Sequence, residues 1–324
     1  MRAMMSLVLS VAMLLVLAPF AVSSTIRADR YDSSYLGLGA LPRYAAVGRL
    51  DFTQSNGGYI GSGTLIAQDW VLTAAHCVDK ALTEKFTIAG RTIVADRWVA
   101  NPSWTGNLAA GYDIGLVHLS TPVPADCVTP AVRYTGSAEL GKVGTFVGYG
   151  MTGTGLTGAV TFDCQERGAQ NMLDAYYPIS KRSVNTRILM ADFDNPSPKK
   201  RSDSHYGSST PLDLEGLIAP GDSGGGLFID VAGQTFLAGV NSFGMAWDGK
   251  VDSDYGDASG DTRVSAFNAW INSVLGPAAF NVNGTSLTAD EEGMQTAGLF
   301  DVIPEPASMS LLALGALLLI RRRR

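Results

Sequence analysis

From about Tyr44 to Phe243 the chain is a succession of short β-type runs separated by glycine, proline, asparagine and aspartate. No helical period of apolar residues persists over several turns there, and runs bounded by such turn formers are typical of strands. Many short strands of this kind favour antiparallel β-barrels or a sandwich. The clearest runs cover residues 59–66, 70–73, 114–119, 144–147 and 235–240.

The chain is long and apolar enough to bury a sizeable core. It has 324 residues, 46% of them hydrophobic, which indicates one large domain or two small ones and excludes general disorder. Apolar runs that approach the thickness of a bilayer occur only at the two ends, which excludes a multi-span membrane protein. One helix is predicted over residues 265–275, with Ser265 as its N-cap and Gly276-Pro277 as its stop.

Residues 1–24 have the pattern of a secretory signal peptide. Arg2 supplies a positive start, a nearly unbroken apolar run follows, and Val22 and Ser24 are small enough to flank a cleavage site before Thr25. The alternative is a retained N-terminal anchor, although the apolar run is short for a full membrane span.

The C-terminal end combines Pro304-Glu305-Pro306, an apolar piece over residues 307–320 and four terminal arginines. The apolar piece is shorter than the about 20 residues that a transmembrane helix needs, and the arginines favour the cytoplasmic side. This order resembles the PEP-CTERM sorting signal of Gram-negative-type bacteria, here residues 302–324. The resemblance implies an exosortase-type sorting enzyme as partner, with export to the cell surface, outer envelope or extracellular matrix. The alternative is a permanent C-terminal anchor.

Removal of both ends would change the charge of the chain. Five of its 24 basic residues lie in these ends and none of its 30 acidic residues does, so residues 25–306 carry a net charge of −11. Such a surface stays soluble and repels anionic polymers. We therefore expect no nucleic-acid partner, and contact with a membrane only through the terminal segments.

Three short segments, far apart in the sequence, each hold one residue type that nucleophilic catalysis needs. A serine hydroxyl is a poor nucleophile until a base takes its proton, and a neutral histidine suits that task near pH 7. A carboxylate behind the histidine fixes its tautomer and stabilises the imidazolium that forms. The segments are Thr73-Ala74-Ala75-His76-Cys77, Asp113-Ile114-Gly115-Leu116-Val117-His118-Leu119 and Gly221-Asp222-Ser223-Gly224-Gly225-Gly226.

Together these segments resemble the chymotrypsin/trypsin-like serine protease family, over roughly residues 44–275. The chain order His, Asp, Ser is that of the family. The resemblance implies an all-β fold of two six-stranded antiparallel β-barrels with a C-terminal helix. It divides the chain into a signal peptide, a protease domain over residues 25–275, a spacer over 276–301 and the sorting signal.

The resemblance also assigns roles within the site. It implies that His76 is the general base, Asp113 its orienting partner and Ser223 the nucleophile. The backbone N–H groups of Gly221 and Ser223 would form the oxyanion hole, which stabilises the charge that develops on the substrate carbonyl oxygen. Such an enzyme needs a polypeptide substrate and no cofactor or metal.

A substrate pocket is implied by residues that flank the nucleophile. Ser242, Phe243 and Gly244 resemble the segment that pairs with the substrate backbone as an added strand. Leu217 falls at the pocket floor, where trypsin-like enzymes have an aspartate, so we expect a small or apolar substrate side chain and not Lys or Arg. The alignment of residues 215–220 with the family pattern allows a second register, in which Glu215 faces the pocket and would restore specificity for Lys or Arg.

Two features depart from the family pattern. Cys77 lacks its usual partner, because the preceding strand offers Gly61 or Ser62 instead, whereas Cys127 and Cys164 could pair with each other. The usual activating N-terminus is also missing. The family pairs it with the aspartate before the nucleophile, Asp222, so either residues freed near Thr25 serve this role or internal hydrogen bonds hold the carboxylate.

The sequence favours a secreted serine endopeptidase over two alternatives. One is a matrix or adhesion protein that keeps the protease fold without catalysis, and the other is an esterase-like acyl hydrolase with the same triad. Asp192 and Asp194 are weak candidates for a metal site, and a solvated loop explains them as well. The sequence leaves the natural substrate and the oligomeric state open.

Overall fold

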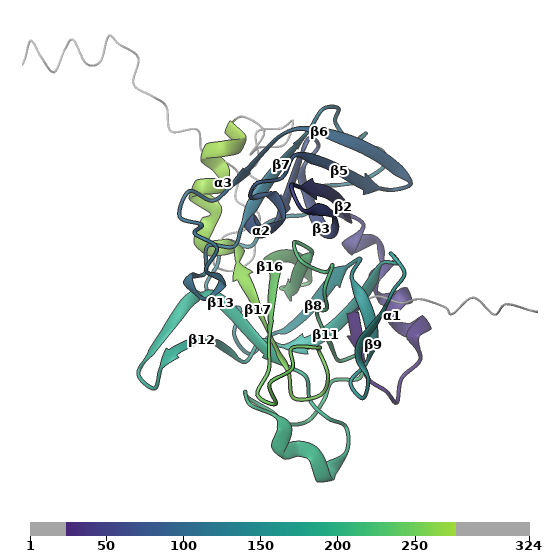
Figure 1. Cartoon of the computed structure of the whole chain (residues 1–324), viewed down its shortest axis with the longest axis vertical. Helices are drawn as coiled ribbons and strands as arrows, with labels where there is room; N and C mark the ends of the chain where they lie inside the picture. The colour runs from purple at the N-terminus through teal and green to yellow at the C-terminus, as the bar shows by residue number, and fades with distance from the viewer. Residues whose placement is uncertain (1–23, 277–324) are drawn as a thin grey trace, which may run out of the picture.

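Two β units stack on one another, and the C-terminal helix lies along the side of the first (Figure 1). The computed structural model describes residues 24–276, so the rest of the proposed signal peptide, the spacer and the sorting signal lie outside the described residues. One apolar cluster fills the first unit and extends to the C-terminal helix and the nearest strands of the second unit, while another fills the interior of the second.

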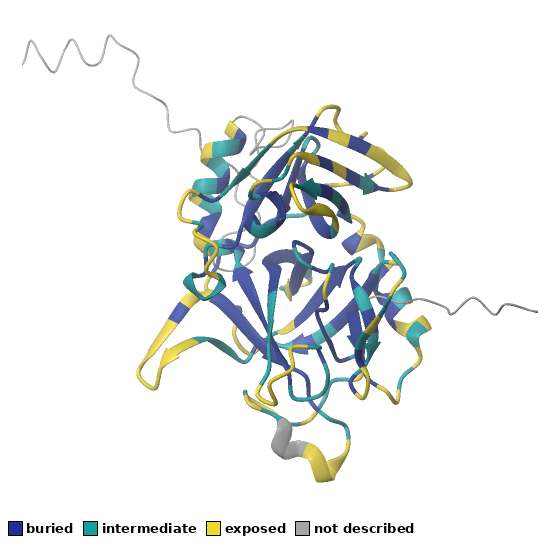
Figure 2. Cartoon of the chain, in the orientation of Figure 1, coloured by how far each residue is buried: buried dark blue, intermediate teal, exposed yellow. Residues whose placement is uncertain are grey.

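The first unit is a closed six-stranded antiparallel barrel in the order β2-β3-β4-β7-β6-β5, as expected. Inward apolar and outward polar side chains alternate along its strands, as Figure 2 shows by burial. On β5, for example, Phe86 and Ile88 are buried whereas Lys85 is exposed. The strands are β2 (Val47–Gln54), β3 (Gly57–Ala67), β4 (Trp70–Thr73), β5 (Thr83–Ile88), β6 (Arg91–Ala100) and β7 (Gly115–Leu119).

The second unit is a seven-stranded antiparallel sheet in the order β11-β8-β15-β16-β17-β13-β12, and differs here from the six-stranded barrel that the resemblance implied. The difference arises at β13, because residues 188–192 pair with β17 while residues 183–190 pair with β12 in a hairpin whose tip projects from the unit (Figure 1). The strands are β8 (Val143–Gly148), β11 (Arg167–Met172), β12 (Ala175–Ser180), β13 (Ser183–Asp192), β15 (Gly226–Val231), β16 (Gln234–Met245) and β17 (Ala258–Arg263).

A small sheet at the edge of the second unit contains a strand that the sequence analysis did not predict. Its order is β10-β9-β1-β14, and β1 runs parallel to β9 and antiparallel to β14. The first described residues of the chain are therefore part of the folded body. The strands are β1 (Ser24–Ile26), β9 (Met151–Thr154), β10 (Gly158–Phe162) and β14 (Gly216–Leu217).

A buried ion-pair network holds the helix that follows β1. The fully buried guanidinium of Arg167 donates to Asp32 Oδ1 at 2.7 Å and lies 3.1 Å from Asp163 Oδ2. Because a buried cation must be paired, this network fixes the helix against β11. The helix is α1 (Asp32–Gly39), and a 3₁₀ turn, η1 (Pro42–Tyr44), leads from it to the barrel.

The C-terminal helix begins later than the sequence predicts. A 3₁₀ turn, η4 (Val264–Phe267), precedes the α-helix α3 (Asn268–Leu275). Ser265 is not its N-cap, because the hydroxyl donates instead to Glu139 Oε1 at 2.8 Å. The buried Arg133 guanidinium donates to the side-chain oxygens of Asn268 and Asn272, one turn apart on α3, and burial lowers the pKa of Arg133 to about 10.

The remaining short elements lie in connections. The predicted polar loop over residues 195–210 includes a 3₁₀ turn, η3. Within residues 24–276 no helix is both long and apolar enough to cross a membrane. The elements are α2 (Ala75–Val78), η2 (Leu108–Ala110) and η3 (Pro198–Asp203).

Replacement of Phe86 by alanine tests whether the first barrel depends on its close-packed interior. The ring is fully buried, so Phe86→Ala leaves a cavity and should lower the free energy of unfolding by about 3–5 kcal/mol, measured by denaturant titration. The control is Val94→Ala on the paired strand β6, where the side chain is 53% exposed and the loss should stay below about 0.5 kcal/mol. Equal losses in both variants would contradict this account of the core.

Candidate active site

His76 lies in the single helical turn α2, directly after β4 of the barrel. Its backbone N–H donates to Asp113 Oδ1 at 2.8 Å, and its ring Nδ1 lies 2.7 Å from Asp113 Oδ2. Two contacts to one carboxylate fix both the position and the tautomer of the imidazole, so that Nδ1 carries the proton. The side chain is 31% exposed, which leaves its other face accessible from solvent.

Asp113 is fully buried and draws its remaining partners from the second unit. The hydroxyl of Ser242 on β16 donates to Asp113 Oδ2 at 2.5 Å, and Thr262 Oγ1 on β17 donates to the backbone carbonyl of Asp113 at 2.8 Å. These two donors were not recognised in this role from the sequence. They mean that Asp113 is held by both β units at once, its carboxylate by Ser242 and its backbone by Thr262.

The turn that carries Ser223 packs against the strand end that precedes His76. Ser62 N–H on β3 donates to the Ser223 carbonyl at 2.8 Å. Gly224 has a φ of +84°, and a β carbon there would lie 2.0 Å from Thr73 Oγ1, so only glycine fits. The structure thus brings together the three segments that the sequence analysis singled out.

Backbone N–H groups beside Ser223 are available for a ligand. Gly221 has a φ of +97°, a conformation that favours glycine, and its carbonyl accepts a hydrogen bond from Ser62 Oγ at 3.0 Å. Among residues 24–276, the N–H groups of Gly221 and Ser223 donate to no protein acceptor. Two such donors next to a serine hydroxyl have the chemistry of an oxyanion hole.

Asp222 is fully buried and held by three hydrogen bonds. The hydroxyl of Ser24 donates to Oδ2 at 2.8 Å, Ala219 N–H donates to the same oxygen at 2.9 Å, and Gly150 N–H donates to Oδ1 at 2.9 Å. Burial raises the pKa of Asp222 to about 6, and these bonds oppose the rise. The sequence offered no signal for the bond from Ser24, whose partner lies 198 positions away.

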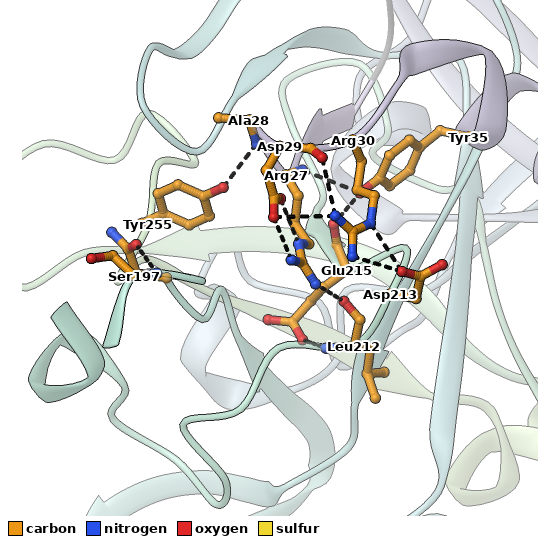
Figure 3. A network of polar contacts seen from close by, with 11 residues as sticks. Arg27, Ala28, Asp29, Arg30, Tyr35, Ser197, Leu212, Asp213, Glu215 and Tyr255 are labelled. Carbon is orange, nitrogen blue, oxygen red and sulfur yellow. Dashed lines mark hydrogen bonds and ion pairs between the residues drawn. The ribbon is translucent and has the colours of Figure 1, made fainter. Parts of the chain in front are cut away.

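A second polar network fixes the segment that follows β1 (Figure 3). Arg27 forms an ion pair with Asp29 at 2.7 Å and donates to the Leu212 carbonyl at 2.6 Å. Arg30 lies 2.8 Å from Asp213. These contacts join the N-terminal segment to the loop before β14, which leads to Ser223.

Glu215 belongs to this network and holds backbone groups rather than a pocket (Figure 3). Its carboxylate accepts the N–H of Asp194 at 2.8 Å and the N–H of Leu212 at 2.5 Å, and burial raises its pKa to about 8. Leu217 is fully buried on β14, where its backbone pairs with Thr25.

The other residues named from the sequence have local roles. Phe243 and Gly244 follow Ser242 on β16 and pair with β17. Asp192 caps a turn, because its Oδ2 accepts the N–H groups of His205 and Tyr206. All three cysteines are free, with Cys77 buried, Cys164 half-buried and Cys127 exposed. The thiol of Cys77 points at the Ser223 carbonyl from 3.8 Å.

Comparison with known proteins gives two family matches. The family model described as Trypsin matches residues 45–271, and the PEP-CTERM protein-sorting motif matches residues 302–324. Chymotrypsin-like elastase family member 1 from Bos taurus is 30% identical over 231 residues, which cover 66% of this chain and 77% of that protein. The same protein from Felis catus is 30% identical over 236 residues, with the same coverage.

Two solved structures share the fold. One is described as HL collagenase, with a TM-score of 0.54 and 18% identity over 79% of this chain and 98% of that chain. The other is neuropsin from mouse brain, with a TM-score of 0.53 and 19% identity over 74% of this chain and 98% of that chain.

The contact between His76 and Asp113 predicts a measurable shift in ionisation. Burial lowers the pKa of His76, but Cys77 and the carboxylate of Asp113 outweigh it and leave the pKa well above its usual value. Asp113→Asn removes a negative partner of the imidazolium, so the pKa of His76 should fall, as followed by NMR titration of the imidazole signals. The exposed control Asp230→Asn should leave it unchanged. An unchanged pKa in Asp113→Asn would show that the carboxylate does not control this histidine.

Proposed function

The chain belongs to the trypsin family and is a serine endopeptidase, and we propose that it cleaves peptide bonds through a triad of His76, Asp113 and Ser223. The observation that carries the proposal is the buried carboxylate of Asp113, which holds the His76 imidazole by two bonds beside the Ser223 turn. A buried, doubly bonded carboxylate behind a partly exposed histidine is the arrangement that a general base requires.

The proposed reaction proceeds through an acyl-enzyme. Ser223 Oγ forms a bond to the substrate carbonyl carbon while its proton passes to Nε2 of His76, and the carbonyl oxygen takes the negative charge. The N–H groups of Gly221 and Ser223 stabilise that charge. The carbon–nitrogen bond then breaks, and the amine leaves with the proton from His76. Water repeats the two steps, so that the acid is released and Ser223 is regenerated.

The raised pKa of His76 determines how the catalytic activity should change with pH. His76 accepts a proton only when neutral, and its pKa is raised by Cys77 and Asp113 against the effect of burial. Activity should therefore rise with pH through that raised pKa, at a higher pH than an ordinary histidine would give.

Substrate backbone would pair with the free edge of β16. Residues Ser242–Met245 extend beyond the pairing of β16 with β15, so their hydrogen-bonded neighbour in the described sheet is β17 alone. An extended peptide added at the opposite edge gains main-chain hydrogen bonds next to His76 and Ser223.

The terminal segments indicate where the enzyme is sorted. The chain carries a PEP-CTERM protein-sorting motif, which is associated with export and surface sorting in bacteria. We propose that the signal peptide is removed before Thr25 and that an exosortase-type enzyme acts at Pro304-Glu305-Pro306. In the mature chain the α-ammonium of Thr25 would then replace the Ser24 hydroxyl beside Asp222.

Loss of the Ser223 hydroxyl should abolish catalysis. A fluorophosphonate probe should label the wild type and leave Ser223→Ala unlabelled, and peptide hydrolysis should fall by about 10⁶-fold, because the acyl-enzyme cannot form. The matched control is Ser120→Ala, an exposed serine directly after β7 that should keep full labelling and activity. Folded wild-type protein that takes no label would contradict the proposal.

Both ends of the mature protein can be read by intact mass and terminal sequencing after expression in a bacterium that carries an exosortase. We expect Thr25 at the N-terminus and loss of the segment that ends in the four arginines. Replacement of Pro304, Glu305 and Pro306 by alanine should leave that tail attached, without effect on fluorophosphonate labelling. Retention of Ser24 would exclude the proposed Thr25–Asp222 pair, and retention of the tail in the wild type would exclude cleavage at the motif.

A further inference from the structure

Two fully buried polar side chains face each other behind the Ser223 turn. Asn241 on β16 pairs directly with Asp261 on β17. The backbone of Asn241 bonds to both glycines after the nucleophile, since its carbonyl accepts Gly224 N–H at 2.8 Å and its N–H donates to the Gly225 carbonyl at 3.0 Å. Directly opposed residues of antiparallel strands present their side chains on the same face of the sheet, so the Asn241 amide and the Asp261 carboxyl are neighbours there.

Most of the polar atoms of this pair have no partner. Nδ2 and Oδ1 of Asn241 and Oδ1 of Asp261 are buried without a hydrogen bond among residues 24–276. The one bond to these side chains comes from Ser259 Oγ, which donates to Asp261 Oδ2 at 3.1 Å. Buried polar atoms are almost always satisfied, so three such atoms in one place indicate a missing ligand.

The position of the pair relates this ligand to catalysis. Their strand neighbours Ser242 and Thr262 direct their hydroxyls to Asp113, so alternation places Asn241 and Asp261 on the opposite face of the two strands. A β carbon on Gly225 would lie 2.9 Å from Asn241 Nδ2, which puts the amide against the turn that carries Ser223. The unsatisfied atoms therefore lie directly behind the nucleophile.

The charge of the pair selects the chemistry of the ligand. No basic side chain of the described chain forms an ion pair with Asp261. A buried carboxyl is stable in its charged form only with a cation close by. A lysine or arginine side chain supplies that cation, and its N–H groups donate to Asp261 Oδ1 and to Asn241 Oδ1.

We propose that Asp261 and Asn241 form the polar end of the primary substrate pocket and select Lys or Arg before the scissile bond. This inference rests on the proposed endopeptidase function and replaces the expectation drawn from Leu217 alone. Leu217 at the pocket floor is apolar. The acidic group that a cationic side chain needs comes instead from Asp261 on β17, at the side of the pocket. This role could not be predicted from the sequence, because Asp261 is distant from Ser223 along the chain.

Burial raises the pKa of Asp261 well above its usual value, and the bond from Ser259 opposes the rise. A lysine or arginine bound beside the carboxyl would favour its charged form and lower this pKa.

The test compares matched peptide substrates that differ only in the residue before the scissile bond, Lys, Arg, Gln, Leu or Ala. Wild type should cleave the Lys or Arg peptide at least about 30-fold more efficiently in kcat/KM than the others, the effect of one buried charge pair. Asp261→Asn should remove that preference, through a loss of at least about 30-fold in kcat/KM for the Lys and Arg peptides. The exposed control Asp230→Asn should keep the wild-type profile.

Wild-type inhibition gives a second measurement that needs no folded variant. Benzamidine, a cation, should inhibit competitively at least about 30-fold more tightly than neutral benzamide. Full fluorophosphonate labelling with a preference for Leu, Ala or Gln would overturn the pocket proposal and leave the endopeptidase function intact. Absence of labelling would overturn both, and an unchanged profile in labelled Asp261→Asn would show that another group selects the substrate.

Discussion

The fully buried carboxylate of Asp113 lies where the two β units meet and is bonded by residues of both. Taking a carboxylate out of water is costly unless every lone pair finds a donor. Here the donors to the carboxylate come from both β units: His76 from the first and the hydroxyl of Ser242 from the second, while Thr262 of the second unit donates to the backbone carbonyl of Asp113. The active site is therefore complete only when the two units pack against each other in this arrangement. A displacement between them would break the Ser242 and Thr262 bonds to Asp113, so the geometry of the triad and the interface stabilise each other.

The residues around this carboxylate could be predicted from sequence because each lies in a short local pattern. His76, Asp113 and Ser223 were identified in this way, and so was the antiparallel strand pattern of both units. Contacts that join distant segments could not be predicted. The bond from Ser24 to Asp222 spans 198 positions, and the opposition of Asn241 and Asp261 depends on strand register. Even the local prediction at Ser265 was wrong, because Glu139 competes for its hydroxyl.

Close packing replaces covalent bridges around the nucleophile. The thiol of Cys77 is buried and free beside the Ser223 carbonyl, and a β carbon on the neighbouring Gly61 would lie 3.2 Å from its sulfur and 3.1 Å from that carbonyl oxygen. A β carbon at that distance from the sulfur is close to where a disulfide would place it, so the bridge is missing because residue 61 is glycine and not because the site is crowded. Glycine allows β3 to approach the catalytic turn so closely that Ser62 can donate both from its backbone and from its hydroxyl. These bonds fix the turn without a disulfide.

The buried acids give stability and activity opposite dependences on pH. Glu84 is buried in the first barrel with both side-chain oxygens unpartnered, and burial raises its pKa to about 9. A carboxyl whose pKa is higher in the folded state binds more protons there, so its contribution to stability is full below its unfolded pKa and is lost as pH rises toward 9. His76 acts as a base only at pH values above its own raised pKa. Rising pH therefore activates the site while it weakens the fold, and the interval between these two effects is set by the environments of Glu84 and His76.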